Sequence, residues 1–179
     1  MINPKLTFKA TVASRAAASS YLREPGDAVI VDRQGPRWLI LMCPCGCESE
    51  IPVNLDPRAG PAWSLYKERK GLSVYPSVWR DADCESHFII LRNRIFMLGS
   101  QYGDLWPCGD IEDEEGLERE TLSRLSSLRD RSYKEISASI VGSVPWDILW
   151  CCRNLCRKGL AIEGLGKSVG RFRKVLKKT

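Results

Sequence analysis

The residue types best suited to metal chemistry fall in two short, well-separated stretches of this chain. In the first, three cysteines alternate with Pro44 and Gly46, and the second is a Cys-x-x-His pair that holds the only histidine. Tetrahedral zinc takes thiolate sulfur and imidazole nitrogen from paired turns of this kind. The spacing therefore predicts a Zn²⁺ site. Five candidate ligands compete for the usual four places, so at least one is spare: Cys43, Cys45, Cys47, Cys84 and His87.

The same stretches hold side chains that a hydrolytic site would need. A catalytic zinc keeps one position for water and usually has a carboxylate nearby as general base. Glu48, Glu50 and Glu85 are candidates for that base, and Ser86 can donate a hydrogen bond to an oxyanion. A Ser-His or Cys-His mechanism, using Ser86 or a spare cysteine, would require His87 to be free of the metal.

A conventional zinc peptidase helix is excluded, because the chain has no HExxH motif. Ligation by three cysteines and His87 would close the metal site and make it structural. Thiolate-rich ligation also makes zinc a poorer Lewis acid. The residues alone therefore favour structural zinc, whose loss should unfold the surrounding domain.

Composition indicates an ordinary soluble protein. Of the 179 residues, 44% are hydrophobic and 27% are charged. No apolar run approaches the roughly 20 residues that span a bilayer. The N-terminus lacks the apolar core of a signal peptide, so we expect a cytoplasmic protein with reduced cysteines and no membrane partner.

The charge distribution predicts two domains. Residues 117–179 hold 14 Lys and Arg against 6 Asp and Glu, whereas residues 1–116 hold 13 against 16. Such asymmetry between halves suggests different roles. We predict a loose N-terminal arm over residues 1–24, a zinc-binding β domain over 25–108, an acidic linker over 109–116 and a basic domain over 117–179.

Short apolar and alternating runs predict a mostly antiparallel β domain without a helix. The expected strands are 28–31, 38–42, 50–55, 63–66, 72–75, 87–91 and 95–98. Four tryptophans fall in this domain, and we expect most in the core and one or two in a peptide-binding groove: Trp38, Trp63, Trp79 and Trp106.

Four motifs in this domain resemble the DUF6527 family over roughly residues 25–98. They are Met42–Cys47, Asn54-Leu55, Leu72–Trp79 and Cys84–Ile90. The resemblance implies a zinc-binding domain encoded beside bacterial ubiquitin-like modifiers and their activating and conjugating enzymes. It further implies a peptidase that matures or removes the modifier.

The basic region resembles a winged helix, which makes the expected fold class α+β. A helical stripe runs over 117–128, and Ser132 with Glu135 forms a capping box that opens a second helix. A third helix starts near Pro145 and stops at Gly159, followed by strands over 160–163 and 171–175. We expect its three cysteines to be core residues.

A basic winged helix binds either nucleic acid or a protein partner. The expected contact residues lie on the third helix and in the wing: Arg153, Asn154, Arg157, Lys167, Arg171 and Arg173. Asp147 and Trp150 on the same helix are unusual in a DNA groove, which favours a protein partner.

Two hypotheses follow from the sequence. The first is a zinc protein of a bacterial ubiquitin-like modification pathway, whose β domain holds a modifier's tail and, if it is an enzyme, cleaves it. The second is a non-enzymatic adaptor or regulator with structural zinc and a DNA- or protein-binding winged helix.

Overall fold

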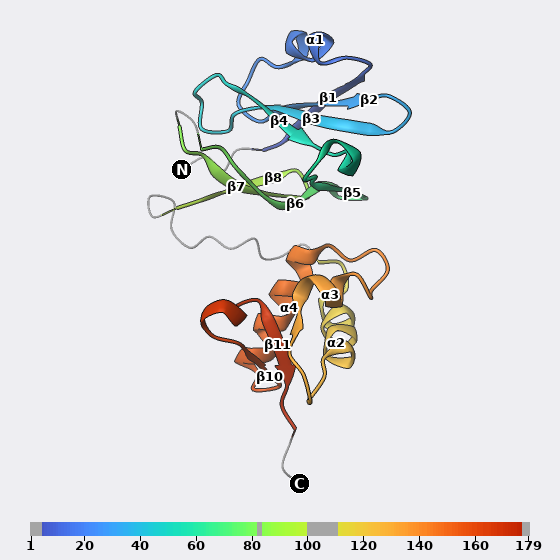
Figure 1. Ribbon diagram of the computed structural model, residues 1–179, viewed down its shortest axis with the longest axis vertical. Coiled ribbons are helices and arrows are strands. Elements are labelled where there is room, and N and C mark those ends of the chain that lie inside the picture. The colour runs from blue at the N-terminus through green and yellow to red at the C-terminus, as the bar shows by residue number, and fades with distance from the viewer. Residues whose placement is uncertain (1–4, 82–83, 100–110, 177–179) are drawn as a thin grey trace. The chain divides into compact units, whose positions relative to one another are not determined.

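The structure, a computed structural model, describes residues 5–81, 84–99 and 111–176 and divides into two compact units (Figure 1). The first unit is Met1–Pro107 and the second is Cys108–Thr179. The chain has the α+β class that the sequence predicted. No helix in the described part of the chain is both long and apolar enough to span a membrane.

In its described residues, 5–81 and 84–99, the first unit contains two four-stranded sheets. One has the order β1-β2-β3-β4 and the other the order β5-β6-β7-β8. Neighbouring strands are antiparallel, except that β1 runs parallel to β2. The strands are β1 (Thr7–Val12), β2 (Asp27–Asp32), β3 (Pro36–Met42), β4 (Glu50–Asn54), β5 (Ser64–Glu68), β6 (Gly71–Trp79), β7 (His87–Leu91) and β8 (Arg94–Leu98).

The main core lies between these two sheets. Side chains alternate along a strand, so Ala28 and Ile30 of β2 face the second sheet and pack with Phe88 and Ile90 of β7. Both sheets contribute fully buried residues to this cluster. The first unit is therefore a β sandwich whose two sheets are held together by buried apolar side chains. The packed sheets support the loops at the ends of their strands.

Residues 5–24, which the sequence predicted to be a loose arm, add an edge strand to the first sheet and cover part of its outer face. They contain β1 and the short helix α1 (Arg15–Ala18), which lies over the first sheet in Figure 1. Ala18 and Leu22 are buried against Val29 and Ile40, on the sheet face opposite the main core. The arm is ordered because the central strands are apolar on both faces and need cover on each.

An irregularity in β6 distinguishes the second sheet. Val74 pairs with Ile90 and Val78 pairs with Phe88, so β6 uses four steps where β7 uses two. Both valines are buried in the core, and the two extra residues of β6 lie between them. Such bulges redirect side chains locally and are common beside functional sites.

Over residues 111–176, the second unit has three α-helices and a three-stranded antiparallel sheet of order β10-β11-β9. Its elements are α2 (Glu114–Arg124), β9 (Arg131–Ser132), α3 (Tyr133–Ser137), α4 (Pro145–Arg157), β10 (Ala161–Glu163) and β11 (Arg171–Lys174). Helix α4 packs against α2, α3 and β10. It contributes buried Cys151 and Cys152 to the core, while Cys156 is half-buried.

The acidic segment predicted to be a linker ends inside α2. Asp113 caps this helix, because its Oδ1 accepts a hydrogen bond of 2.8 Å from the Gly116 amide. Glu114 and Glu115 follow in the first turn, where negative charge is favourable to the helix dipole. Acidic residues at this position therefore serve helix initiation as well as solubility.

Candidate functional site

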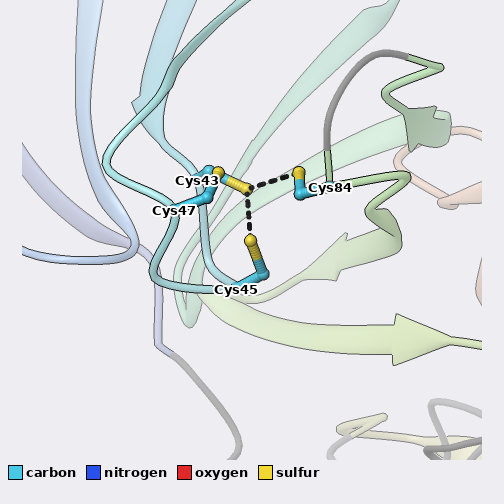
Figure 2. Close-up of side chains that lie close together, drawn as sticks. All are labelled: Cys43, Cys45, Cys47 and Cys84. Atoms are coloured by element: carbon cyan, nitrogen blue, oxygen red, sulfur yellow. Dashed lines mark hydrogen bonds between the residues drawn. The ribbon is translucent and has the colours of Figure 1, made fainter.

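Four cysteines from two loops converge at one edge of the first unit (Figure 2). Cys43 directly follows β3, and Cys45 and Cys47 lie in the tight turn that leads to β4. The turn is closed by a 2.8 Å hydrogen bond from the Cys43 amide to Ser49 O, and Gly46 takes a φ of 88° that favours glycine. Cys84 comes from the loop before β7, so the cluster links the two sheets.

The spacing of the four sulfurs suits a tetrahedral metal ion. All four Sγ atoms lie within 4.8 Å of one another, and Cys43 Sγ is 3.3 Å from Cys45 Sγ and 3.7 Å from Cys84 Sγ. Zinc bound by four thiolates with bonds of about 2.3 Å would separate its sulfurs by about 3.8 Å. The donor set and its dimensions therefore fit Zn²⁺.

The thiols are placed in contrasting electrostatic environments. Burial raises the pKa of Cys43 to about 12, whereas a hydrogen bond from the Ser49 side chain lowers the pKa of Cys47 to about 6. A hydrogen bond from Ser86 also lowers the pKa of Cys84. A divalent cation at the centre would compensate the buried negative charge that Cys43 must carry as a ligand.

Ser86 belongs to this cluster. It is buried, and its Oγ lies 3.2 Å from Cys84 Sγ and 3.5 Å from Cys43 Sγ. The sequence suggested Ser86 as an oxyanion donor or a nucleophile. Its position instead suits a hydrogen bond that supports thiolate ligands from outside the first coordination sphere.

His87, the fifth candidate ligand, is not a member of the cysteine group. Its Nε2 atom lies 3.0 Å from Ser77 Oγ, within hydrogen-bonding distance. The sequence left at least one of the five candidate ligands spare, and the described cysteines group without His87. The metal-ligand role of each candidate stays a prediction. A histidine free of the cluster meets the condition that the sequence set for a Ser-His mechanism.

Ser77, which the sequence prediction missed as a functional residue, is held by its surroundings. It lies in the bulged part of β6, and its carbonyl oxygen accepts a 3.1 Å hydrogen bond from Trp63 Nε1. Trp79, two residues later, pairs directly with His87, and the two rings are 6.1 Å apart. Trp79 is 69% exposed. Its ring therefore presents an apolar surface to solvent beside the Ser77 and His87 side chains.

The three glutamates proposed as general bases lie apart from the cysteine group. Glu48, Glu50 and Glu85 are all exposed, and none is a member of the cluster. Glu48 and Glu85 adopt positive φ angles of 57° and 48°, as expected of residues in tight turns around the cysteines. Trp38 and Trp63 are half-buried, and Trp106 lies outside the described residues.

On α4, the residues predicted to bind nucleic acid or a partner contact other groups of the second unit. Arg153 is 3.4 Å from Glu163, and Asn154 Nδ2 donates to Glu114 at 3.1 Å. Arg157 donates to Asn154 Oδ1 at 2.6 Å and lies over the Trp150 ring.

Two of the three predicted wing residues also contact carboxylates of the second unit. A guanidinium nitrogen of Arg171 lies 3.7 Å from a carboxylate oxygen of Glu135. The Nε atom of Arg173 lies 3.8 Å from Asp130 Oδ1. Lys167 is exposed in the loop between β10 and β11. Most of the positive charge predicted to face a partner is thus balanced by carboxylates of the same unit.

The fold and site define a β sandwich with a four-cysteine cluster of metal-binding type and, apart from it, a serine–histidine pair. A family model described as "Bacterial ubiquitination-like system serine protease (BubE)" matches residues 14–98, a little under half of the chain. The matched segment contains all four clustered cysteines together with Ser77 and His87.

This similarity supports the bacterial ubiquitin-like context predicted from the sequence, under a family name other than DUF6527. Neither the curated proteins nor the solved structures compared with the chain gave a match.

Proposed function

We propose that this chain is a serine-type peptidase of a bacterial ubiquitin-like modification system, with Ser77 as nucleophile and His87 as general base. The observation that carries the proposal is the 3.0 Å separation of Ser77 Oγ and His87 Nε2, outside the cysteine cluster. The serine protease description of the matching family supports the same chemistry.

The proposed reaction is acyl transfer in two steps. Neutral His87 accepts the Ser77 hydroxyl proton at Nε2 as Oγ attacks the scissile carbonyl carbon. The resulting imidazolium then protonates the leaving amine, and the acyl group remains on Ser77. Water, deprotonated by His87, hydrolyses this ester and restores both side chains. The proposed substrate is the tail of a ubiquitin-like modifier, either as a precursor or as a conjugate.

We further propose that Cys43, Cys45, Cys47 and Cys84 hold a structural Zn²⁺. When bound, zinc supplies a closed four-thiolate cross-link rather than a water nucleophile. Residues next to the cluster then position the His87 side chain. Cys84 and Ser86 immediately precede β7, so fixing them also fixes the point at which His87 enters its strand.

Replacing Ser77 by alanine tests the peptidase. The purified protein and its S77A variant would be incubated with a modifier carrying a C-terminal extension, and release of the extension measured by mass spectrometry. We expect cleavage to fall at least about a thousandfold, because the nucleophile is lost. S64A is the matched control, because Ser64 is an exposed serine of β5 outside the cysteine cluster, and it should retain the chemical step. Cleavage by S77A at the unaltered rate would refute the assignment.

For the second unit we propose a winged helix that docks a protein. The element order and the sheet order β10-β11-β9 support that fold. Two exposed apolar side chains, Leu165 and Val169, flank Lys167 in the loop between the last two strands. Internal pairing of the arginines leaves less positive charge for phosphates than the sequence suggested.

Binding to a duplex DNA oligonucleotide distinguishes the two partner classes. We expect fluorescence anisotropy to show no saturable binding at 150 mM salt, because the basic groups of α4 and β11 already face carboxylates. Saturable binding that weakens steeply with added salt, and is lost in K167E, would instead favour the nucleic-acid adaptor.

A further inference from the structure

A cavity of about 360 Å³ lies in the first unit, on the side of the first sheet that α1 covers. It is lined by Val31, Trp38 and three arginines, Arg15, Arg33 and Arg37. The volume is in the range of sites that bind small molecules. Its described lining includes no acidic residue, so positive charge dominates its walls.

Each arginine is held in place by a different contact. The Arg15 guanidinium lies over the Trp38 ring, 5.3 Å from the ring centroid. Arg33 donates from Nε to the Ala13 carbonyl at 2.8 Å, which orients the guanidinium plane without using its terminal nitrogens. Arg37 donates to the buried carboxylate of Asp56 through one terminal nitrogen.

These contacts leave donors available. Among the described residues, the terminal nitrogens of Arg33 have no protein acceptor. The Nε of Arg37 has none either but is buried, so the donor that Arg37 can offer a ligand is its second terminal nitrogen. A guanidinium fixed along one edge presents its remaining N–H groups as a planar fork, which matches the oxygens of an oxyanion. Little side-chain entropy remains to be lost when such a ligand binds.

The balance of charge indicates which oxyanion the cavity suits. Three guanidinium groups contribute three positive charges, and the carboxylate that Arg37 contacts, Asp56, is shared with Arg58. The walls therefore keep a positive charge of at least two, which suits a phosphate group with about 1.5 to 2 negative charges at neutral pH. A single carboxylate would leave the cavity with excess positive charge.

We propose that this cavity is a phosphate-binding site, in which the fork of Arg33 and the second terminal nitrogen of Arg37 hold the oxygens and Arg15, stacked on Trp38, closes the third side. The phosphate comes either from inorganic phosphate or from a phosphate monoester such as a nucleotide. The site is separate from the Ser77–His87 pair, and its existence does not depend on peptidase activity.

Titration of the full-length, zinc-loaded protein tests this site by ¹H–¹⁵N NMR. The signal followed is the Trp38 indole N–H, assigned by its loss in W38F. Sodium phosphate and AMP would be added separately at constant ionic strength, with sodium chloride as the control. We expect saturable shifts with phosphate. Tighter binding of AMP would identify a nucleotide, and equal or weaker binding would identify free phosphate.

Two lysine substitutions make the test specific. R33K keeps the charge but loses the fork, and we expect affinity for phosphate to fall about tenfold. R94K is the matched control, because Arg94 lies over the Phe96 ring and is not among the residues lining the cavity. Unsaturable shifts equal to those with chloride, or equal effects of R33K and R94K, would overturn the proposal. The amide spectra of both variants report whether the fold is intact.

Discussion

Ser77 and Ser86 are nine residues apart and have different surroundings in the folded protein. Ser86 is buried with its hydroxyl beside two cysteine sulfurs, whereas Ser77 lies beside the His87 ring. Both are small hydroxyl side chains next to a reactive group, and the sequence drew attention only to the one adjacent to the histidine. Strand pairing, rather than proximity along the chain, decides which serine meets the imidazole.

This contrast predicts opposite effects of two alanine substitutions on metal binding. In S86A the thiolates lose a supporting hydrogen bond, and we expect zinc affinity to fall roughly 10- to 100-fold. In S77A zinc affinity should be unchanged. Competition with a chromophoric zinc chelator measures both. A loss of zinc affinity in S77A equal to that in S86A would mean that the two serines are not functionally separate.

At the scale of single elements, the capping box of α3 offers a pH-dependent test. The Ser132 amide donates a hydrogen bond to the Glu135 carboxylate at 2.7 Å, and this bond lowers the pKa of Glu135 below its ordinary value of 4.5. Because the folded-state pKa is lowered, the stabilisation is complete above pH 4.5. It is lost as the pH falls through the lowered value.

We therefore expect hydrogen-exchange protection at the start of α3 to decline as the pH falls below 4.5. The Glu135 amide, which donates to Ser132 Oγ at 3.2 Å, is the probe. In E135Q the protection factor, corrected for intrinsic exchange, should be lower above pH 4.5 and should not change with pH in this range. A parallel decline in E135Q would show that another group controls the helix start.

The elements also show how far the sequence could be used to predict the fold. The strands over 38–42 and 87–91 and the capping box at Ser132 were predictable, because each depends on a local pattern of apolar or hydrogen-bonding residues. The ordered arm was not. Residues 5–24 contribute two buried apolar side chains, Ala18 and Leu22. These side chains stabilise the fold only because β2 and β3 present an apolar face to them, and that face is formed by residues later in the chain.

The candidate site likewise has one part that the sequence could predict and one part that it could not. The four cysteines could be found from spacing alone, since zinc ligands occur in recognisable turns. The Ser77–His87 pair could not be found, because it depends on the register of β6 with β7 and on the irregularity between Val74 and Val78. A signal was present in the only histidine, whose partner the sequence did not identify.

At the scale of the whole molecule, the two units differ in their cysteines. The cysteine cluster joins the turn after β3 to the loop before β7, and so links the two sheets of the first unit. Helix α4 of the second unit carries three further cysteines, none of which belongs to a metal-type cluster among the described residues. Its core is instead built from apolar side chains of α4 and its neighbours.

Removal of the metal should therefore unfold one unit and spare the other. Binding of structural zinc contributes about 10 kcal/mol or more, comparable with the whole stability of a small domain. We expect a chelator to collapse the dispersion of NMR signals from residues 5–99 and to leave those from 111–176 in place. Loss of both sets together, or of neither, would contradict independent stabilisation.

The two extra residues of β6 have a consequence for shortened versions of this strand. Side chains alternate between faces, so removing one residue between Val74 and Val78 would turn one of the two valines away from the core. Removing two would preserve every inward-facing side chain and yield a regular ladder. The bulge thus adds two residues to β6, and an insertion of two keeps the same side chains facing the core. A version of this protein shortened by these two residues is expected to keep the sandwich fold and to lack the bulge in which Ser77 lies.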